Sequence, residues 1–391
     1  MKEIAGKIKS KSNPFPKRLK TEHALIEDEK KMAGEFNIFF TNIGPKLAQK
    51  IPDINKSFED YVYRNNSMIE DNELSFDEFE KAFKSIQRNK AAGYDDITSN
   101  IIIDVYHEIK YPLYEVFKCS IQEGKFPDKL KIAKVTPSFK SGDSSSLGNY
   151  RPISVLPVFS KILEKIMYNR VYSFLSEGKL LYKKQFGFQK NTSTEHAILQ
   201  LIDDITKAFS DGKYTLGVFI DLSKAFDTVN HEILLKKMDL YGVRGISKKW
   251  FESYLKNRKQ FVNSSDKINT TFLEIQCGVP QGSILGPLLF LIYVNDLCKA
   301  SPEISTLMFA DDSNLFLSHK SIDALFTTMK SELEKVSEWF KANKLSLNTG
   351  KTKFSLFHPI RKRKAIPNNL PKLYIDNIEI KRDYITKFIF I

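Results

Sequence analysis

Hydrophobic residues follow two spacings along the chain, and each spacing predicts one kind of secondary structure. Apolar residues recur every three or four positions in segments that we expect to form helices with one buried face. These segments are residues 30–51, 76–86, 159–174, 197–209, 233–240, 250–255 and 322–341. Short apolar or alternating runs predict strands at residues 129–140, 216–220 and 372–376. Because helices and strands mix without a strict β–α–β alternation, we expect an α+β fold.

Segments without such a periodicity are interpreted as connections. Residues 1–20 are basic and contain two prolines, so we expect a poorly ordered lead-in. The charged stretch of residues 52–72 is interpreted as a linker or surface loop. The longest apolar run, Ile284–Val294, is interrupted by Gly286 and Pro287 and is too short to span a bilayer. The N-terminus lacks the apolar stretch of a signal peptide, so we expect an intracellular protein, nuclear or cytoplasmic or both, without a membrane partner.

The charge balance points to a polyanionic partner. The chain has 60 Lys and Arg against 47 Asp and Glu, which gives a net charge of +13. Nucleic acid is the first partner this favours and an anionic membrane the second, although solvated surface lysines produce the same balance. The three cysteines lie far apart and the histidines show no ligand spacing. A disulfide framework and a zinc knuckle are therefore not supported.

Two adjacent acids mark a predicted hairpin. Phe309-Ala310-Asp311-Asp312 stands between two apolar runs that are each short enough for a strand. Neighbouring carboxylates repel one another and resist burial without a counter-charge. A divalent cation removes that conflict, and carboxylate oxygens suit Mg²⁺. The alternative is an ordinary polar turn, because Asp and Ser are common turn residues.

A further acid, Asp221, ends the apolar run of residues 216–220. It precedes Asp311 by 90 positions (311 − 221), so only the tertiary fold can unite the two. If neighbouring strands bring them together, they form a cluster able to hold two Mg²⁺. Two such ions stabilise the attacking and leaving oxygens of an in-line phosphoryl displacement. Surface acids at strand ends are the alternative.

Five blocks of sequence resemble the motifs of reverse transcriptases, in the order of that family. They are residues 149–154 (Asn-Tyr-Arg-Pro-Ile-Ser, the fingers segment), 219–227 (motif A), 278–287 (motif B), 309–312 (motif C) and 343–352 (motif D). Together they resemble the enzymes of non-LTR (LINE-like, jockey-type) retrotransposons, over roughly residues 35–388.

This resemblance implies a right-hand polymerase fold with palm and fingers and with the thumb largely absent. The implied parts are an N-terminal basic and helical extension (1–75), fingers (76–213), a palm (214–358, with a fingers-like insertion at about 232–275) and the end of the palm with a truncated start of the thumb (359–391). The last residues, 387–391, resemble the segment that leads into the thumb. No endonuclease segment is expected before the blocks, and no cysteine-rich segment after them.

The resemblance also implies an activity, RNA-directed DNA polymerisation with two Mg²⁺ ions, or Mn²⁺ in their place. The implied partners are an RNA template, a DNA primer and dNTPs. Asp221 and Asp311 become catalytic metal ligands, with Asp312 as an assistant because successive strand residues point to opposite faces. Lys351 becomes the acid that protonates departing pyrophosphate, unless it is a solvated turn lysine.

The nucleotide-binding residues follow from the same resemblance. Phe226 lies where the family places an aromatic ring under the incoming sugar, to exclude a 2′-hydroxyl; a core aromatic is its alternative. Arg151 offers a planar fork of donors for triphosphate oxygens, with Lys140 as its companion. Gln281 and Gly282 resemble the residues that line the nucleotide and template pocket, where glycine permits close backbone approach.

Several readings stay open or are rejected. Asp227 and Asn230 are predicted to cap the helix at residues 231–240. Gly350-Lys351-Thr352 is not a phosphate-binding P-loop, because that motif needs a glycine where Leu345 stands. Two rival functions remain: a catalytically inactive or truncated retroelement fragment that only binds RNA, and a template-independent nucleotidyl transferase. The oligomeric state is open.

Overall fold

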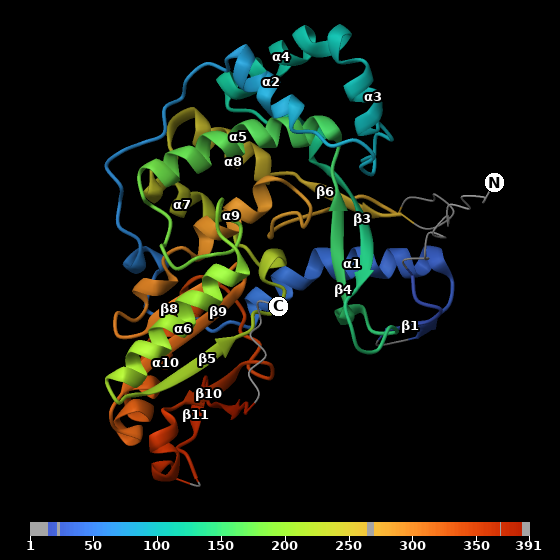
Figure 1. Cartoon of the computed structure of the whole chain (residues 1–391). Helices are drawn as coiled ribbons and strands as arrows, with labels where there is room; N and C mark the ends of the chain where they lie inside the picture. The colour runs from blue at the N-terminus through green and yellow to red at the C-terminus, as the bar shows by residue number, and fades with distance from the viewer. Residues whose placement is uncertain (1–14, 22–23, 264–269, 368, 385–391) are drawn as a thin grey trace, which may run out of the picture.

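The computed structural model describes residues 15–21, 24–263, 270–367 and 369–384, and the whole chain is drawn in Figure 1. Helices and strands are mixed in these residues, which confirms the α+β fold class. The helices are α1 (Glu29–Gln49), α2 (Phe76–Lys84), α3 (Ser99–Asp104), α4 (Tyr106–Glu123), α5 (Val158–Glu177), α6 (Thr194–Ser210), α7 (His231–Tyr241), α8 (Gly245–Leu255), α9 (Leu285–Val294) and α10 (Ile322–Ala342). The predicted end of the chain, residues 387–391, lies outside the described residues.

The strands form three sheets. They are β1 (Leu19–Lys20), β2 (Leu25–Ile26), β3 (Ile132–Phe139), β4 (Tyr150–Val155), β5 (Tyr214–Ile220), β6 (Lys259–Val262), β7 (Leu273–Glu274), β8 (Ser305–Phe309), β9 (Asp312–His319), β10 (Lys353–Phe357), β11 (Leu373–Ile375) and β12 (Ile378–Arg382). The larger sheets have the strand orders β11-β12-β10-β5-β9-β8 and β4-β3-β6-β7, and β1 pairs with β2.

Strand β5 lies in the middle of the six-stranded sheet and is buried along its whole length. Alternate residues of a strand point to opposite faces. Phe219 packs with Leu201 of α6, whereas Val218 belongs to the main core together with Leu325 of α10. Helices therefore cover both faces, which explains why the strand is nearly all apolar rather than alternating. Figure 1 shows this sheet at one end of the molecule and helices α2 to α4 at the other.

The four-stranded sheet has its own core, formed with α1. Phe36 and Phe40 of α1 pack with Val135, Tyr150 and Val262 of the sheet. Phe15 and Leu19 are buried in the same core. The prediction of a poorly ordered lead-in is therefore wrong for residues 15–20, because their apolar side chains cover this second core.

The segment of residues 52–72 is also more than a surface linker. Phe58 and Tyr61, in a short 3-10 helix, are buried in the main core, and Val62 and Ile69 are buried with them. Charged residues separate these buried residues in the sequence, so the segment shows no regular apolar spacing. The segment instead packs across helices α7 and α10, where Lys236 pairs with Glu59 and Lys56 with Glu338.

The apolar run of residues 284–294 forms α9, a helix whose residues are nearly all buried. Among the described residues, no helix is both long and apolar enough to cross a membrane. The seven predicted helices and three predicted strands are confirmed within a few residues. Short elements such as α3, β6, β7 and β12 were not predicted, because they are too short to show a period. The longer helix α4 was also not predicted, because few of its residues are buried.

Candidate active site

The predicted acidic hairpin is confirmed. Strands β8 and β9 pair antiparallel, with Phe309 opposite Asp312, so Ala310 and Asp311 form the turn. Ala310 has a left-handed backbone, with φ of 57°, a conformation that residues other than glycine adopt at a cost of about 1–3 kcal/mol. Asp311 is exposed at the tip, and Asp312 is half-buried at the start of β9.

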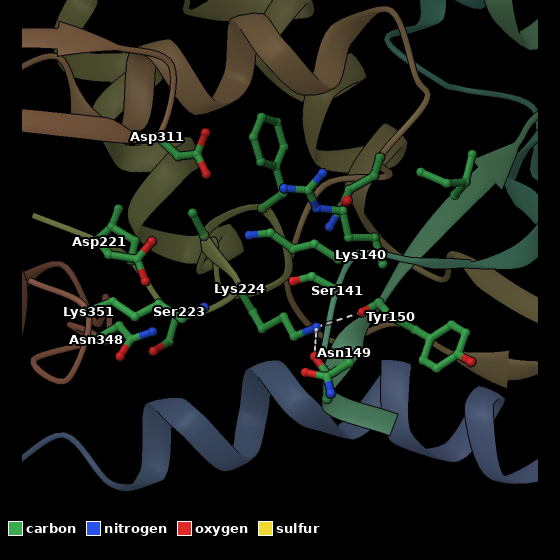
Figure 2. A pocket seen from close by; sticks show the side chains of 17 residues that line it. Lys140, Ser141, Asn149, Tyr150, Asp221, Ser223, Lys224, Asp311, Asn348 and Lys351 are labelled. Atoms are coloured by element: carbon green, nitrogen blue, oxygen red, sulfur yellow. Dashed lines mark hydrogen bonds between the residues drawn. The ribbon is translucent and has the colours of Figure 1, made fainter. Parts of the chain in front are cut away.

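The register of the sheet brings Asp221 to this hairpin. In the pairing of β5 with β9, Ile220 lies opposite Ser313, so Asp221 leaves β5 at the end of the sheet where Asp312 begins β9. Figure 2 shows the carboxylates of Asp221 and Asp311 on the same side of one cavity. The acids that are 90 residues apart in the sequence (311 − 221) therefore meet.

The cavity has a volume of about 490 Å³ and lies between the six-stranded sheet and strands β3 and β4. Seven of the predicted site residues line it: Lys140, Arg151, Asp221, Phe226, Gln281, Asp311 and Lys351. Asp312 and Gly282 do not line it. Asp221, Asp311 and Lys351 lie on one wall, and Lys140 and Lys224 lie on the opposite, cationic wall (Figure 2). This arrangement suits a ligand that has both a bound cation and an anionic tail.

The acids lack cationic partners of their own. Within the described part of the chain, none of Asp221, Asp311 and Asp312 forms an ion pair. Burial raises the pKa of Asp312 to about 7, and the charges of Asp311 and Asp221 add to the effect. Three unpaired carboxylates that repel one another form an environment in which a cation is stabilised.

This set of donors fits a divalent ion that is also held by its substrate. The described residues contain no group of three His, Cys, Asp or Glu side chains able to hold a metal alone. Mg²⁺ characteristically binds one or two carboxylates together with substrate phosphates. Asp221 and Asp311 on the cavity wall therefore match Mg²⁺ better than a metal that needs a closed protein cage.

The cationic wall includes a residue that the sequence did not single out, Lys224. Its Nζ donates to the carbonyl oxygens of Tyr150 (2.7 Å) and Gly148 (3.1 Å), at the start of β4. Burial lowers the pKa of Lys224, and nearby Lys140 and Arg151 add to this. Lys224 thereby ties the loop after Asp221 to the strand that carries Arg151. Nothing in its spacing distinguishes it from other lysines.

The backbone of Asp221 is held by the block of residues 343–352. The N–H of Asn348 donates to the carbonyl of Asp221 (2.9 Å), and the N–H of Asp221 donates to Oγ1 of Thr352 (3.3 Å). Lys351 lies between these two contacts, is exposed and lines the cavity. The last of the five blocks therefore holds the first acid in place and adds a cation beside it.

Phe226 combines its two predicted alternatives. Its ring stacks on Phe290 of α9, with ring centres 4.8 Å apart, and meets Phe188 edge-on. It also lines the cavity. The ring is thus fixed by core packing and also forms part of the cavity lining.

Gln281 is fixed from two sides. Its Nε2 donates to Oδ1 of Asp227 (2.8 Å), and its carbonyl accepts from the N–H of Ser154 in β4 (2.8 Å). Asp227 therefore orients Gln281 and is not a helix cap, so that part of the prediction is wrong. Asn230 is the cap of α7, as predicted, because its side chain accepts from the N–H of Ile233 (3.0 Å).

Gly282 permits a close approach, although to protein rather than to the cavity. Its φ is +129°, and a Cβ there would lie 2.3 Å from the carbonyl oxygen of Ser154. Nearby, the buried carboxylate of Glu164 accepts from the N–H groups of Ile284 (2.7 Å) and Leu285 (3.3 Å), which begin α9. Glu164 was missed because it appears in the sequence as one more charged residue on a helix.

The buried Asp227 predicts a pH effect on stability. Burial raises the pKa of Asp227 from 3.8 to about 6, and its Oδ2 has no hydrogen-bond partner in the structure. Between pH 4 and pH 6 the folded state holds this proton and the unfolded state loses it, so the free energy of unfolding falls by about 3 kcal/mol as pH rises.

Asp227→Asn removes that contribution and keeps an acceptor for Gln281. We expect urea unfolding of this variant to show a flatter stability profile between pH 4 and pH 6, and higher stability than wild type above pH 6. Asp323→Asn, at an exposed acid in the first turn of α10, is the matched control. Parallel profiles for Asp227→Asn and wild type would contradict the prediction.

Comparison with known proteins agrees with this geometry. Residues 137–369 match the family model described as "Reverse transcriptase (RNA-dependent DNA polymerase)". The "Probable RNA-directed DNA polymerase from transposon BS" of Drosophila melanogaster is 30% identical over 293 residues, which are 71% of this chain and 32% of that protein. The "RNA-directed DNA polymerase from mobile element jockey" of the same species is 27% identical over 292 residues, 71% of this chain and 31% of that protein. The chain spans about a third of the length of these relatives.

Proposed function

Because the chain belongs to the reverse transcriptase family of non-LTR retrotransposons, we propose that it catalyses RNA-directed DNA synthesis. The 3′-oxygen of a DNA primer forms a bond to the α-phosphorus of a dNTP paired with the RNA template. The bond between the α-phosphorus and its bridging oxygen breaks, and pyrophosphate leaves. One observation carries the proposal: two acids from distant motifs and a set of cations line one cavity of about 490 Å³.

The proposed division of the chain is a right-hand polymerase. Residues 214–358, which carry strands β5, β8, β9 and β10 and helix α10, are the palm, and residues 76–213, which include α6, are the fingers. Pairing of β6 with β3 supports the assignment of residues 232–275 as a fingers-like insertion, because it extends the sheet of residues 132–155. The packing of α1 on that same sheet joins the N-terminal extension to the fingers. Residues 359–391 remain assigned to the end of the palm, whose sheet includes β11 and β12, and to the truncated start of the thumb.

Asp221 and Asp311 are the proposed metal ligands, and Mg²⁺ is the proposed metal, with Mn²⁺ as its alternative. When bound, two such ions would stabilise the negative charge on the attacking and leaving oxygens. The chain's own contribution is to hold the two carboxylates at one end of the sheet. The contacts of Asn348 and Thr352 with the backbone of Asp221 support this role. Asp312, behind the cavity wall, is the proposed assistant.

The cationic wall is proposed to bind the triphosphate. Arg151 offers two parallel donors and Lys140 a point charge, a combination suited to phosphate oxygens. Lys224 holds the backbone of residues 148–150 and thereby fixes the start of the strand that carries Arg151. Lys351 donates a proton to the pyrophosphate as it leaves. Gln281, oriented by Asp227, faces the nucleotide and template. Gly282 has no side chain and so allows Ser154 of β4 to pack directly against this loop.

A primer-extension assay on a defined RNA template tests the proposal. We expect incorporation of the dNTP that is complementary to the template base, dependent on a divalent ion. Incorporation that is indifferent to the template would favour the template-independent nucleotidyl transferase. Salt-dependent RNA binding without incorporation would favour a fragment that only binds RNA. Either result would overturn the proposal.

Phe226 is proposed to exclude ribonucleotides. The ring lies against Phe290 and cannot retreat into the core, so a 2′-hydroxyl beside it meets a fixed obstacle. Phe226→Val removes most of the ring. We expect discrimination between dNTP and rNTP, measured as the ratio of kcat/KM values, to fall by about 10–200-fold.

Phe226→Tyr is the matched control, because it keeps the bulk of the ring and should keep the discrimination. An unchanged ratio in Phe226→Val would show that the ring acts only as a core residue.

A further inference from the structure

The turn that carries Asp311 is braced by a segment outside the hairpin, residues 184–187, here called the bracing segment. It lies beside β8, where the N–H of Phe186 donates to the carbonyl of Met308 (2.8 Å) and the N–H of Met308 donates to the carbonyl of Lys184 (2.9 Å). These two bonds form a parallel bridge between Gln185 and Met308. The edge of the sheet next to the acids is therefore covered rather than open.

The side chain of Gln185 forms hydrogen bonds with the backbone of the turn at Ala310. Its Oε1 accepts from the N–H of Ala310 (3.0 Å), and its Nε2 approaches the carbonyl of Ala310 (3.4 Å). The N–H and the carbonyl of Ala310 thus both contact the amide side chain of Gln185. Gln185 is buried, with 4% of its surface exposed, so water does not compete for these contacts.

The shape of the bracing segment fits the turn closely. A Cβ on Gly187 would lie 2.1 Å from the backbone nitrogen of Ala310, so no larger residue fits there without displacement. The N–H of Gly187 also donates to Oε1 of Gln185 (2.8 Å), which holds the amide in its orientation. Ala310 is the residue with the left-handed backbone, and a strained conformation persists when its surroundings determine it.

The bracing segment is itself anchored. Nε2 of Gln189 donates to the carbonyl of Gln185 (2.8 Å), and Oγ1 of Thr192 donates to the carbonyl of Phe186 (2.6 Å). The hydroxyl of Tyr172 in α5 accepts from the N–H of Lys190 (2.8 Å). Gln185 therefore connects the turn to helix α5 through a chain of hydrogen bonds.

We propose that Gln185 is a positioning residue for Asp311. It holds Ala310 in its left-handed conformation and so fixes where the next carboxylate points. The catalytic consequence rests on the proposed function, whereas the bracing of the turn does not. Residues that orient a metal ligand typically change metal affinity by 10–100-fold when they are replaced.

Gln185→Met tests this inference, because Met has a similar length and lacks both amide groups. Gln122→Met is the matched control, since it makes the same exchange at an exposed glutamine of α4, whose amide donates to Glu73 and does not contact the hairpin. The first readout needs no metal or substrate: hydrogen exchange of the peptide that covers residues 307–313. The second is the Mg²⁺ concentration that gives half-maximal primer extension at saturating dNTP.

We expect Gln185→Met to speed exchange of this peptide by about tenfold or more while the amides of β5 keep their protection. The Mg²⁺ concentration at half-maximal activity should rise about tenfold or more, with kcat recovering toward wild type at high Mg²⁺. Gln122→Met should leave both values near those of wild type. Gln185→Asn, which is too short to reach Ala310, gives the same test if Gln185→Met fails to fold.

Unchanged exchange would overturn the bracing of the turn. Faster exchange without a change in Mg²⁺ dependence would overturn the positioning of Asp311 and leave Gln185 a structural residue. A wild-type chain without any template-directed activity would overturn the proposed function instead, and the exchange result would still decide whether Gln185 braces the turn.

Discussion

Asp311→Asn is expected to reduce the rate of primer extension by about 10³-fold or more, equivalent to about 4 kcal/mol of transition-state stabilisation. Asn has nearly the same shape and lacks the charge, so a divalent ion loses one of its two carboxylates on the cavity wall. Asp221→Asn should have an effect of the same size, because it lines the same cavity. Rates are compared at saturating dNTP and at several Mg²⁺ concentrations.

Two further variants make the test specific. Asp323→Asn, at an exposed acid of α10, should leave the rate unchanged. Asp312→Asn should cost about tenfold at most, because Asp312 does not line the cavity. If Asp311→Asn kept wild-type activity, the assignment of the metal site would be wrong, whatever the other variants did.

Lys237→Met is expected to lower the free energy of unfolding by about 3–5 kcal/mol. Lys237 and Asp296 form a fully buried ion pair between α7 and the end of α9, with Nζ 2.7 Å from Oδ1. Burial lowers the pKa of Lys237 and raises that of Asp296, because the core disfavours both charges. Nζ also donates to the carbonyl of Tyr293 and lies over the ring of Trp339 in α10. Removal of the cation leaves the carboxylate of Asp296 unpaired in the core.

Urea unfolding at neutral pH measures this loss. Lys236→Met is the matched control, because Lys236 is the next residue of α7 and its side chain is 62% exposed. A change within about 0.5 kcal/mol is expected there. The double variant Lys237→Met/Asp296→Leu should recover most of the stability, since an apolar pair replaces a complete ion pair at little cost. Equal free energies of unfolding for Lys237→Met and Lys236→Met would contradict the prediction.

Local periodicity was enough to predict seven of the helices and the central strand β5, but not helices α4 and α9. The three- and four-residue spacing in α5 and α10 and the apolar run of β5 appear in the sequence because each faces a core along its length. The segment of residues 52–72 misled the same reasoning. Its buried residues, such as Phe58 and Tyr61, occur singly or in pairs between charged residues, so they show no helical or strand periodicity.

The sequence by itself was enough to identify the family of this protein and to predict the residues of its candidate site, the acids Asp221 and Asp311 and the cations Lys140 and Arg151. Only the tertiary structure decided how these residues meet. Asp221 and Asp311 are 90 positions apart (311 − 221), and the register between β5 and β9 that brings them together cannot be deduced from the sequence pattern. The tertiary structure also decided the supporting roles. The side chains of Gln185, Lys224 and Asp227 form hydrogen bonds with backbone or amide groups, and such contacts require no regular spacing in the sequence.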